Sequence, residues 1–277
     1  MTITAGGTLN DLREIRSQLD RLPRFRVAQT LAEVAASWRM VYEVYLKSGL
    51  IHPNPYLVHT TPHHVSANTA VLQSTRHGEV EATLTAVVDG PLGLPMDSVY
   101  QRELDELRLQ GRRITEYGLF AHVRQITDAE PPILNESSCP GSASSFARVH
   151  ASVINLMRLA FYFALSSNST DFIVGVHPRH ARFYSRSFGF EQYGPLRTCP
   201  TVNHRPVVLL HANLQQCLQR SPLPHALDYC INHPVSAETF ADRCAFNPCD
   251  MAASPTRISS YLREKQDQHV MASLNAG

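Results

Sequence analysis

The segment Asp171–Phe190, DFIVGVHPRHARFYSRSFGF, constrains the fold more than any other part of this chain. Its first six residues, through Val176, are nearly all apolar, which is typical of a short strand buried on both faces of a sheet. A helix is predicted from about His180 to Ser187, and Gly189 stands where a helix-ending glycine is favoured. The segment therefore predicts a strand inside a sheet, followed directly by a helix that packs on that sheet.

Hydrophobic periodicity and capping signals predict the remaining elements. Strands are expected at residues 25–28, 65–73, 80–88, 114–123 and 207–211, and helices at residues 10–22, 30–48, 97–109 and 146–165. Thr30 and Glu33 have the spacing of a capping box at the start of the first long helix. Polar residues 75–79 predict a turn between two antiparallel strands. This order of elements predicts a mixed α+β sheet with helices on both faces.

The charges of the chain are balanced, with 25 Lys and Arg against 24 Asp and Glu and a net charge of +1. Such a balance provides no global field that would favour nucleic acid or an anionic membrane as the partner. No stretch approaches the roughly 20 apolar residues of a membrane span, and the charged N-terminal segment does not have the pattern of a secretory signal. We therefore expect a cytoplasmic protein with no nucleic-acid partner and no membrane span.

Histidine and cysteine are plentiful, but their spacing does not favour a metal site. Six scattered cysteines, at positions 139, 199, 217, 230, 244 and 249, are expected to be reduced thiols. A zinc alternative combines Cys230, Cys244 and Cys249 with His225 or His233, but it contains no C-x-x-C pair. His59, His63 and His64 lie in an irregular proline-rich segment without a helical i, i+4 pair. We predict no bound metal.

The helix and its glycine stop resemble the second half of a GNAT acyltransferase domain. In that superfamily a buried strand precedes a helix with a Phe-Tyr pair that ends at Gly-Phe, and the matching residues here are Phe183, Tyr184, Gly189 and Phe190. The sequence from Arg39 to Tyr42 resembles a motif of the superfamily's first helix. The resemblance implies a GNAT-like mixed, mostly antiparallel central sheet. It also implies three parts, an N-terminal helical arm (1–24), an acyltransferase domain (25–221) and a C-terminal accessory segment (222–277).

One superfamily feature is missing, and its absence bears on the acyl donor. Acetyl-CoA-dependent members carry a glycine-rich turn whose backbone N–H groups hold the pyrophosphate of the cofactor. Residues 124–145 stand at the corresponding junction and form a long Pro- and Ser-rich segment without that turn. The phosphopantetheine of an acyl carrier protein has one phosphodiester and no pyrophosphate. The expected donor is therefore an acyl carrier protein, with acyl-CoA as the alternative and no permanently bound cofactor.

Within the superfamily, the chain is similar to the long-chain N-acyl amino acid synthases over about residues 25–215. Residues 114–121, ITEYGLFA, resemble their strand motif, in which a glutamate precedes small and apolar residues. The acyl-homoserine lactone synthases are more distant, because residues 51–64 contain none of the acidic side chains that hold their cationic substrate. The resemblance implies transfer of a medium or long acyl chain to the amine of an amino acid. An acyl-homoserine lactone synthase and a non-catalytic acyl-binding or regulatory module are the alternatives.

Two side chains are candidates for the proton transfers of thioester aminolysis. Glu116 lies on the strand expected to line the thioester cleft, where burial would raise its pKa; the alternative is an edge carboxylate paired with Arg112 or Arg113. Tyr184 is at the position where the superfamily places a tyrosine that protonates the departing sulfur. Its alternative is a core aromatic whose hydroxyl meets a backbone carbonyl.

The remaining candidate residues would bind the two substrates. The backbone of Leu119, Phe120, Ala121, His122 and Val123 is expected to pair with the amides of pantetheine, as a neighbouring strand would. The single phosphate would be held by Arg124, Arg148 and the helix start at Ser144 and Ser145, although a solvated basic surface is the alternative for each. Arg39, Tyr42 and Tyr45 are expected near the acyl or acceptor pocket, and core packing explains the two tyrosines equally well.

The segment after Pro222 is expected to be accessory, because its apolar residues are sparse and only residues 258–263 show a helical pattern. A chain truncated after residue 221 is accordingly expected to stay folded.

Overall fold

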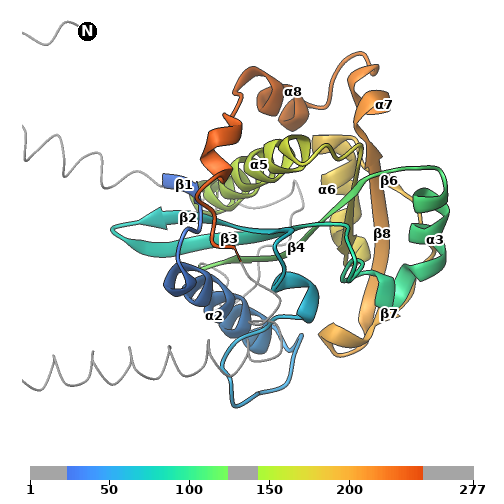
Figure 1. Cartoon of the computed structure of the whole chain (residues 1–277). Coiled ribbons are helices and arrows are strands. Elements are labelled where there is room, and N and C mark those ends of the chain that lie inside the picture. The colour runs from blue at the N-terminus through green and yellow to red at the C-terminus, as the bar shows by residue number, and fades with distance from the viewer. Residues whose placement is uncertain (1–23, 124–142, 246–277) are drawn as a thin grey trace, which may run out of the picture.

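A computed structural model describes residues 24–123 and 143–245, with backbone only for residues 143–150. The helix predicted at residues 10–22 lies outside the described residues. The chain forms one mixed sheet with helices packed on both of its faces (Figure 1). This arrangement confirms the predicted α+β class and the mostly antiparallel, GNAT-like sheet.

The sheet has the strand order β1-β2-β3-β4-β5-β8-β6, with β7 paired to β8 at one end. The strands are β1 (Arg24–Val27), β2 (Thr69–Arg76), β3 (Glu79–Val88), β4 (Ile114–His122), β5 (Asp171–Val176), β6 (Glu191–Gln192), β7 (Arg197–Cys199) and β8 (Arg205–Asn213). All neighbours are antiparallel except β4 and β5, which are parallel. The strands β6 and β7 were not predicted, because two or three residues are too few to show a period-2 pattern.

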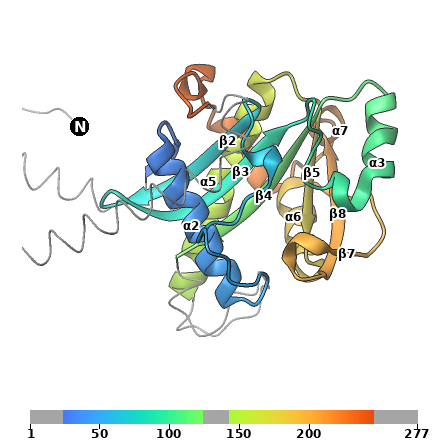
Figure 2. The same cartoon turned by 60° about the horizontal axis from the view of Figure 1, so that its bottom comes forward.

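Helices α5, α6 and α8 cover one face of the sheet, and α2 and α3 cover the other (Figures 1 and 2). The helices are α2 (Leu31–Lys47), α3 (Asp97–Leu109), α5 (Ala143–Ser166), α6 (Pro178–Phe188), α7 (Leu214–Leu218) and α8 (His225–Asn232), with short 3-10 turns η1 (Pro62–His64), η2 (Pro200–Val202) and η3 (Ala237–Phe240). The core consists of three sets of buried residues. One lies between α2 and the sheet, one between α3 and the sheet, and the largest between α5 and the sheet.

The helix ends follow the sequence signals closely. The Thr30 hydroxyl accepts a hydrogen bond from the Glu33 N–H, and the Glu33 carboxylate accepts one from the Thr30 N–H, which completes the predicted capping box at the start of α2. Helix α6 ends at Gly189, whose φ of 78° is the left-handed conformation that glycine adopts without strain.

The β2–β3 hairpin differs from its prediction by a few residues. Residues 62–64 form the turn η1, so β2 begins at Thr69 and not at Val65. At its other end β2 continues to Arg76, and the turn consists of His77 and Gly78, both with positive φ. A two-residue turn with positive φ at both positions matches the twist of a hairpin, so the polar residues at 75 and 76 belong to the strand.

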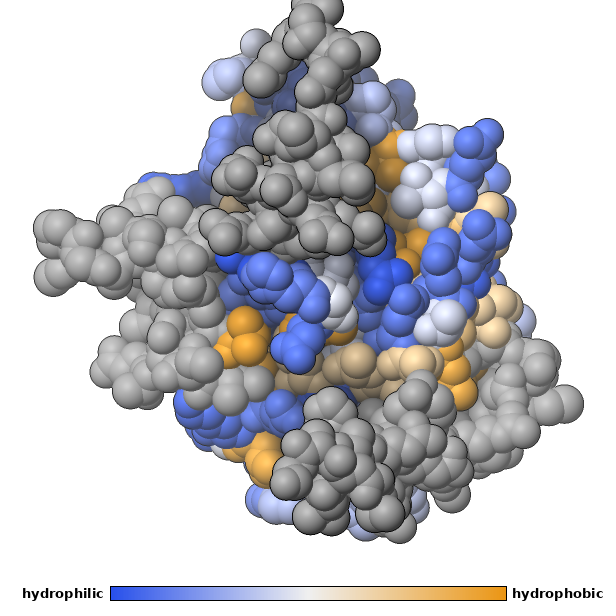
Figure 3. Space-filling view, turned by 90° about the vertical axis from the view of Figure 1, so that its left-hand side faces the viewer, coloured by the Kyte–Doolittle hydropathy of each residue, from blue (hydrophilic) through white to orange (hydrophobic). Residues whose placement is uncertain are grey.

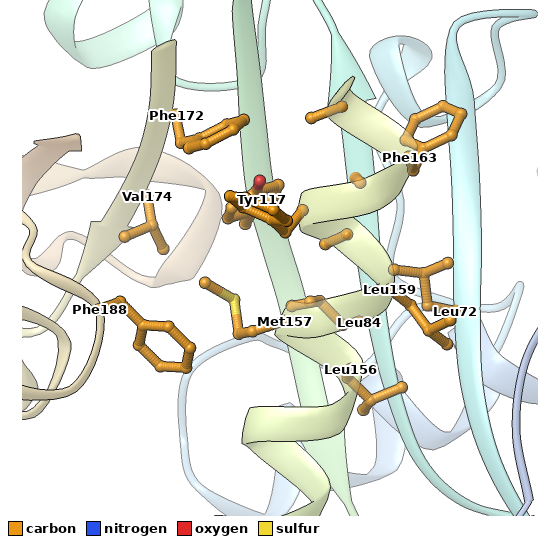
Figure 4. Close-up of a cluster of buried hydrophobic side chains, with 14 of the residues drawn as sticks. Leu72, Leu84, Tyr117, Leu156, Met157, Leu159, Phe163, Phe172, Val174 and Phe188 are labelled. Carbon is orange, nitrogen blue, oxygen red and sulfur yellow. The ribbon is translucent and has the colours of Figure 1, made fainter. Parts of the chain in front are cut away.

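The largest part of the core lies between α5 and the sheet (Figure 4). Leu156, Met157, Leu159 and Phe163 extend from α5 toward side chains of the four central strands. The sheet contributes Leu72, Leu84, Tyr117, Phe172 and Val174 to this cluster, and α6 contributes Phe188. Burial of this cluster fixes α5 and α6 on the same face, on either side of the boundary between β4 and β5.

Part of the accessory segment also belongs to this core. Helix α8 was not predicted, yet Ala226, Leu227 and Cys230 are buried in the same cluster as α5 and β4, as is Phe240 of η3. No strand comes from residues 214–245. The expectation that a chain truncated after residue 221 stays folded therefore needs revision, because such a truncation would uncover the apolar face of α5.

Figure 3 views the molecule from the side of β1 and the β2–β3 turn, where hydrophilic and hydrophobic residues are interspersed over the coloured surface. In the described ranges, no helix has both the length and the apolar character needed to cross a bilayer.

Candidate active site

The candidate site lies where the pairing of β4 with β5 stops. The two strands are in register from Ile114 and Asp171 to Tyr117 and Val174. Beyond this point β4 stays paired with β3 as far as His122, so the edge of β4 that faced β5 is left without a described strand partner. A β-bulge accompanies the change, and Leu119 has a φ of 50°. The sheet therefore has a gap between β4 and β5 beyond Tyr117 and Val174.

Alternation along β4 determines which backbone N–H and C=O groups point toward β3 and which point away from it. The Val123 N–H donates to the Glu81 carbonyl of β3 at 2.8 Å. Because neighbouring residues of a strand direct their backbone groups to opposite sides, Ala121 also faces β3, whereas Phe120 and His122 face the gap. Of the predicted stretch from Leu119 to Val123, Ala121 and Val123 therefore pair with β3.

Glu116 is buried beside this gap, with only 4% of the residue exposed. Its Oε2 accepts a hydrogen bond from the Met96 N–H at 2.9 Å. Burial raises the pKa of Glu116 to about 8, the Met96 hydrogen bond opposes the rise, and the negative charges of Asp97 and Asp89 add to it. A carboxyl group with such a pKa exchanges a proton readily near neutral pH.

The alternative interpretation of Glu116, an ion pair with Arg112 or Arg113, is not found. The Arg112 Nε lies 3.9 Å from an oxygen of Asp171. The Arg113 guanidinium donates to the Ser167 carbonyl at 3.2 Å. Both arginines are therefore engaged elsewhere, and Glu116 has no basic partner in the described part of the chain.

An ion-pair network holds the backbone segment that reaches Glu116. Asp97, the first residue of α3, accepts a hydrogen bond from the Leu94 N–H at 2.6 Å. Arg108, three turns along α3, contacts Asp97 at 2.8 Å and Asp89 at 2.7 Å. This network places the Met96 N–H against Glu116. No sequence motif marks this network, since Asp89, Asp97 and Arg108 are 8 and 11 residues apart and match no periodic pattern.

Tyr184 and Tyr45 approach the gap from opposite faces of the sheet. Tyr184, on α6, is 7% exposed, and burial raises its pKa to about 12. Burial also raises the pKa of Tyr45, on α2, and the nearby Tyr184 hydroxyl adds to the increase. Within the described ranges no backbone carbonyl accepts a hydrogen bond from Tyr184. At a pKa of about 12 the Tyr184 phenol stays protonated near neutral pH, which a proton donor to a thiolate requires.

The other candidates on α2 lie differently. The Tyr42 hydroxyl accepts a hydrogen bond from the Asn54 N–H at 3.4 Å, so it helps to hold residues 51–61 over the helix. Arg39 forms an ion pair with Glu43 at 3.1 Å on the half-exposed side of α2. Of the three predicted residues, Tyr45 is therefore the one that the structure brings to Tyr184.

The four candidates for binding the phosphate lie outside the described residues or have side chains that do. Arg124 lies beyond the described residues, as do the side chains of Ser144, Ser145 and Arg148. The backbone of α5 does begin at Ala143, next to the predicted helix start.

An apolar cavity of about 20 Å³ lies on the α5 face of the sheet. Tyr117, Phe172 and Phe188 line it from the two central strands and α6, and the other lining residues are Met157, Phe161, Phe190, Ala212, Leu214, Cys217, Leu227 and Cys230. It abuts the last residues of the β4–β5 pairing, and Figure 4 shows its aromatic side chains converging there. An apolar lining of this kind binds hydrocarbon in preference to polar groups.

The histidines and cysteines considered for metal have structural surroundings. No group of three or more potential ligands occurs among the described residues. His64 is buried, and its Nδ1 accepts a hydrogen bond from the Thr61 N–H at 3.0 Å. Burial raises the pKa of the Cys230 thiol to about 12, which disfavours the thiolate that zinc requires. Cys249 lies outside the described residues.

Helix α6 begins immediately after β5 and has a basic outer face. Arg179, Arg182 and Arg186 are exposed along it, and no carboxylate within the described ranges forms an ion pair with Arg179 or Arg182. The positive N-terminal end of the helix dipole adds to this charge. An acidic partner would therefore be attracted to the side of the gap formed by α6.

Comparison with known proteins gives one family. The sequence profile of the N-acyl amino acid synthase FeeM matches residues 36–136 and 140–213, more than half of the chain. The fold is similar to that of FeeM, an N-acyl amino acid synthase from uncultured soil microbes, with 22% identity over 70% of this chain and 93% of that chain and a TM-score of 0.52. No curated protein sequence matches the chain.

Two further solved structures show lower similarity. The CoA-dependent acyl-homoserine lactone synthase BjaI is 12% identical over 76% of this chain and 90% of its own, with a TM-score of 0.44. An acyl-CoA N-acyltransferase from Pseudomonas aeruginosa is 12% identical over 68% of this chain and 98% of its own, with a TM-score of 0.37.

Proposed function

Because this chain belongs to the FeeM family of N-acyl amino acid synthases, and is an N-acyltransferase, we propose that it transfers a medium or long acyl chain from an acyl-carrier-protein thioester to the α-amine of an amino acid. The observation that carries this proposal is the buried Glu116 carboxyl, free of any described basic partner, at the point where β4 and β5 separate.

The transfer is direct and needs no covalent enzyme intermediate. The amine nitrogen forms a bond to the thioester carbon while Glu116 takes up the proton that the nitrogen loses. When the tetrahedral intermediate collapses, the carbon–sulfur bond breaks and the thiolate receives a proton from Tyr184. Holding the amine and thioester together in the gap supplies a further large part of the rate.

The pantetheine arm is proposed to lie along the free edge of β4. Its amides would pair with the backbone of the stretch from Leu119 to Val123, as an added strand pairs with a sheet edge. Arg124, Arg148 and the helix start at Ser144 and Ser145 are proposed to hold its single phosphate. The acyl chain would enter beside Tyr117 and would have to displace lining side chains, because the apolar cavity there has a volume of only about 20 Å³.

The basic face of α6 supports a carrier protein as the donor. Arg179, Arg182 and Arg186 are exposed on α6, the helix that follows β5, so a carrier with acidic side chains around its phosphopantetheine would be steered to this face.

The test is to incubate the protein with acyl carrier proteins charged with different chain lengths and with an amino acid mixture, and to detect N-acyl amino acids by mass spectrometry. We expect turnover with the carrier-bound donor to exceed turnover with acyl-CoA of the same chain length. Faster turnover with acyl-CoA refutes the carrier assignment. Lactone formation that depends on S-adenosylmethionine would identify an acyl-homoserine lactone synthase, and thioester binding without turnover would identify an acyl-binding module.

A further inference from the structure

The hydroxyl of Thr85 is buried without a hydrogen-bond partner in the described structure. The residue is 1% exposed, and its Oγ1 has no donor or acceptor within reach. Thr83, two residues earlier on the same face of β3, is also buried, but its hydroxyl donates to the Leu72 carbonyl at 3.0 Å. Since buried polar groups are rarely left unpaired, Thr85 is suited to a partner from outside the chain.

The register of the sheet places this hydroxyl beside Glu116. Thr85 is paired with Gly118, and Val87 with Glu116, so the three side-chain positions 85, 116 and 118 share one face. Thr85 lies directly opposite Gly118 and diagonally from Glu116, a separation of roughly 7–8 Å that a glutamate side chain can span across a residue without a side chain. The Thr85 hydroxyl and the Glu116 carboxyl therefore border the same small volume above Gly118.

Gly118 leaves that volume unfilled. Apart from the adjoining residues, the one atom that a methyl group at this position would meet within 4 Å is Oε1 of Glu116, at 4.0 Å. The other carboxylate oxygen, Oε2, is occupied by the Met96 N–H. Oε1 of Glu116 and Oγ1 of Thr85 thus border the volume, and neither has a hydrogen-bond partner among the described residues.

We propose that this volume is the seat of the acceptor amine, with one N–H of a primary α-amine donated to Thr85 and the other to Glu116. The nitrogen lone pair then points toward the gap where the thioester carbon lies. This inference rests on the proposed N-acyl transfer and adds a specificity. A secondary amine, such as an N-methyl amino acid, has one N–H and can satisfy only one of the two oxygens, so it is expected to be a poor acceptor.

Thr85→Val tests the proposal, because it removes the hydroxyl and keeps the shape. We expect kcat/KM for a primary amino acid to fall about tenfold to a hundredfold, as for the loss of one hydrogen bond to a reacting group, with the KM for the acyl donor unchanged. The preference for primary over N-methyl amino acids should shrink by the same factor. Thr85→Ser should restore both. The melting temperature should not fall, since the lost hydroxyl has no partner in the folded chain.

Thr83→Val is the matched control. It loses the bond to Leu72 and is expected to lower the melting temperature without changing amine kinetics. Gly118→Ala places a methyl group in the proposed seat and should raise the KM for the amine while the protein stays folded, because Gly118 does not require a positive φ.

Unchanged amine kinetics and unchanged selectivity in Thr85→Val would overturn the inference, as would a loss of stability with full activity in the molecules that remain folded. Failure of the wild-type protein to acylate any amine would instead refute the proposed function. The inference would then still be tested by the rise in wild-type melting temperature with each proteinogenic amino acid, a rise that Thr85→Val should abolish and whose persistence would refute the seat.

Discussion

Replacing Glu116 by glutamine separates a proton-transfer role from a packing role. A proton-transfer role predicts a slower reaction in a more stable protein, whereas a packing role predicts an unchanged rate in a less stable protein. Glutamine has nearly the same shape, and its side-chain oxygen can still accept the hydrogen bond from the Met96 N–H. What it loses is the ability to take up a proton. We expect the maximal rate to fall about 10²- to 10⁴-fold, the range of general acid–base contributions, with donor affinity nearly unchanged.

The same substitution is expected to stabilise the fold above pH 5. The pKa of Glu116 is about 8 in the folded protein and 4.5 is its ordinary value, so the folded state keeps a proton that the unfolded chain has already released between these two pH values. Folding stability therefore decreases as pH rises from 4.5 to 8. At about 1.4 kcal/mol per pH unit the full cost is roughly 5 kcal/mol, and water entry and local relaxation reduce it to an expected ~1–3 kcal/mol.

Two measurements check this pair of effects. Urea unfolding from pH 4.5 to pH 9 should show the variant gaining on the wild type as pH rises, with no difference at the acid end. In the wild type kcat should rise with pH up to about pH 8, because the base must be deprotonated. In the variant kcat should not change with pH over this range. A glutamine variant that is less stable at pH 8 and fully active would refute the reasoning.

Further substitutions test the other parts of the site. Tyr184→Phe should lower kcat about tenfold to a hundredfold, the low end of general acid effects, and single-turnover kinetics with unchanged rate would refute its role. Arg182→Glu should raise the KM for an acyl carrier protein and leave the KM for acyl-CoA unchanged, with the difference shrinking as salt increases. Arg108→Gln should cost roughly 3–5 kcal/mol in urea unfolding, because Asp97 and Asp89 lose their partner; a cost below the experimental error would show that the network is dispensable. A chain ending at residue 221 should aggregate or melt without cooperativity, because Leu227 and its neighbours no longer cover α5; a cooperative melt would restore the original domain boundary.

The sequence predicted the central elements because each has its own periodicity or cap. The strand before α6, the capping box at Thr30 and the glycine stop at Gly189 are local patterns, and the structure has each of them within a residue or two. The position of Glu116 on a largely apolar strand was also sufficient to predict its burial.

The rest of the site depends on register and on contacts between distant segments. The Met96 N–H that meets Glu116 is 20 residues away and its side chain is not involved, so no residue pattern marks it. Thr85 is identified only once its pairing with Gly118 on β4 is known. Helix α8 was missed for a different reason. It has eight residues between prolines at 224 and 234, too short a segment for its buried positions to stand out from irregular structure.

The brief parallel pairing of β4 and β5 bears on how such an enzyme diversifies. Because the sheet opens between these strands, the proposed acyl cavity lies between the sheet and α5, α6 and α8 on one face, and the proposed amine seat lies at β3, β4 and the start of α3 on the other. Few side chains belong to both. Chain-length preference can therefore drift through replacements such as Met157 or Leu227 without altering the choice of amino acid, and relatives of this chain can combine the two preferences independently.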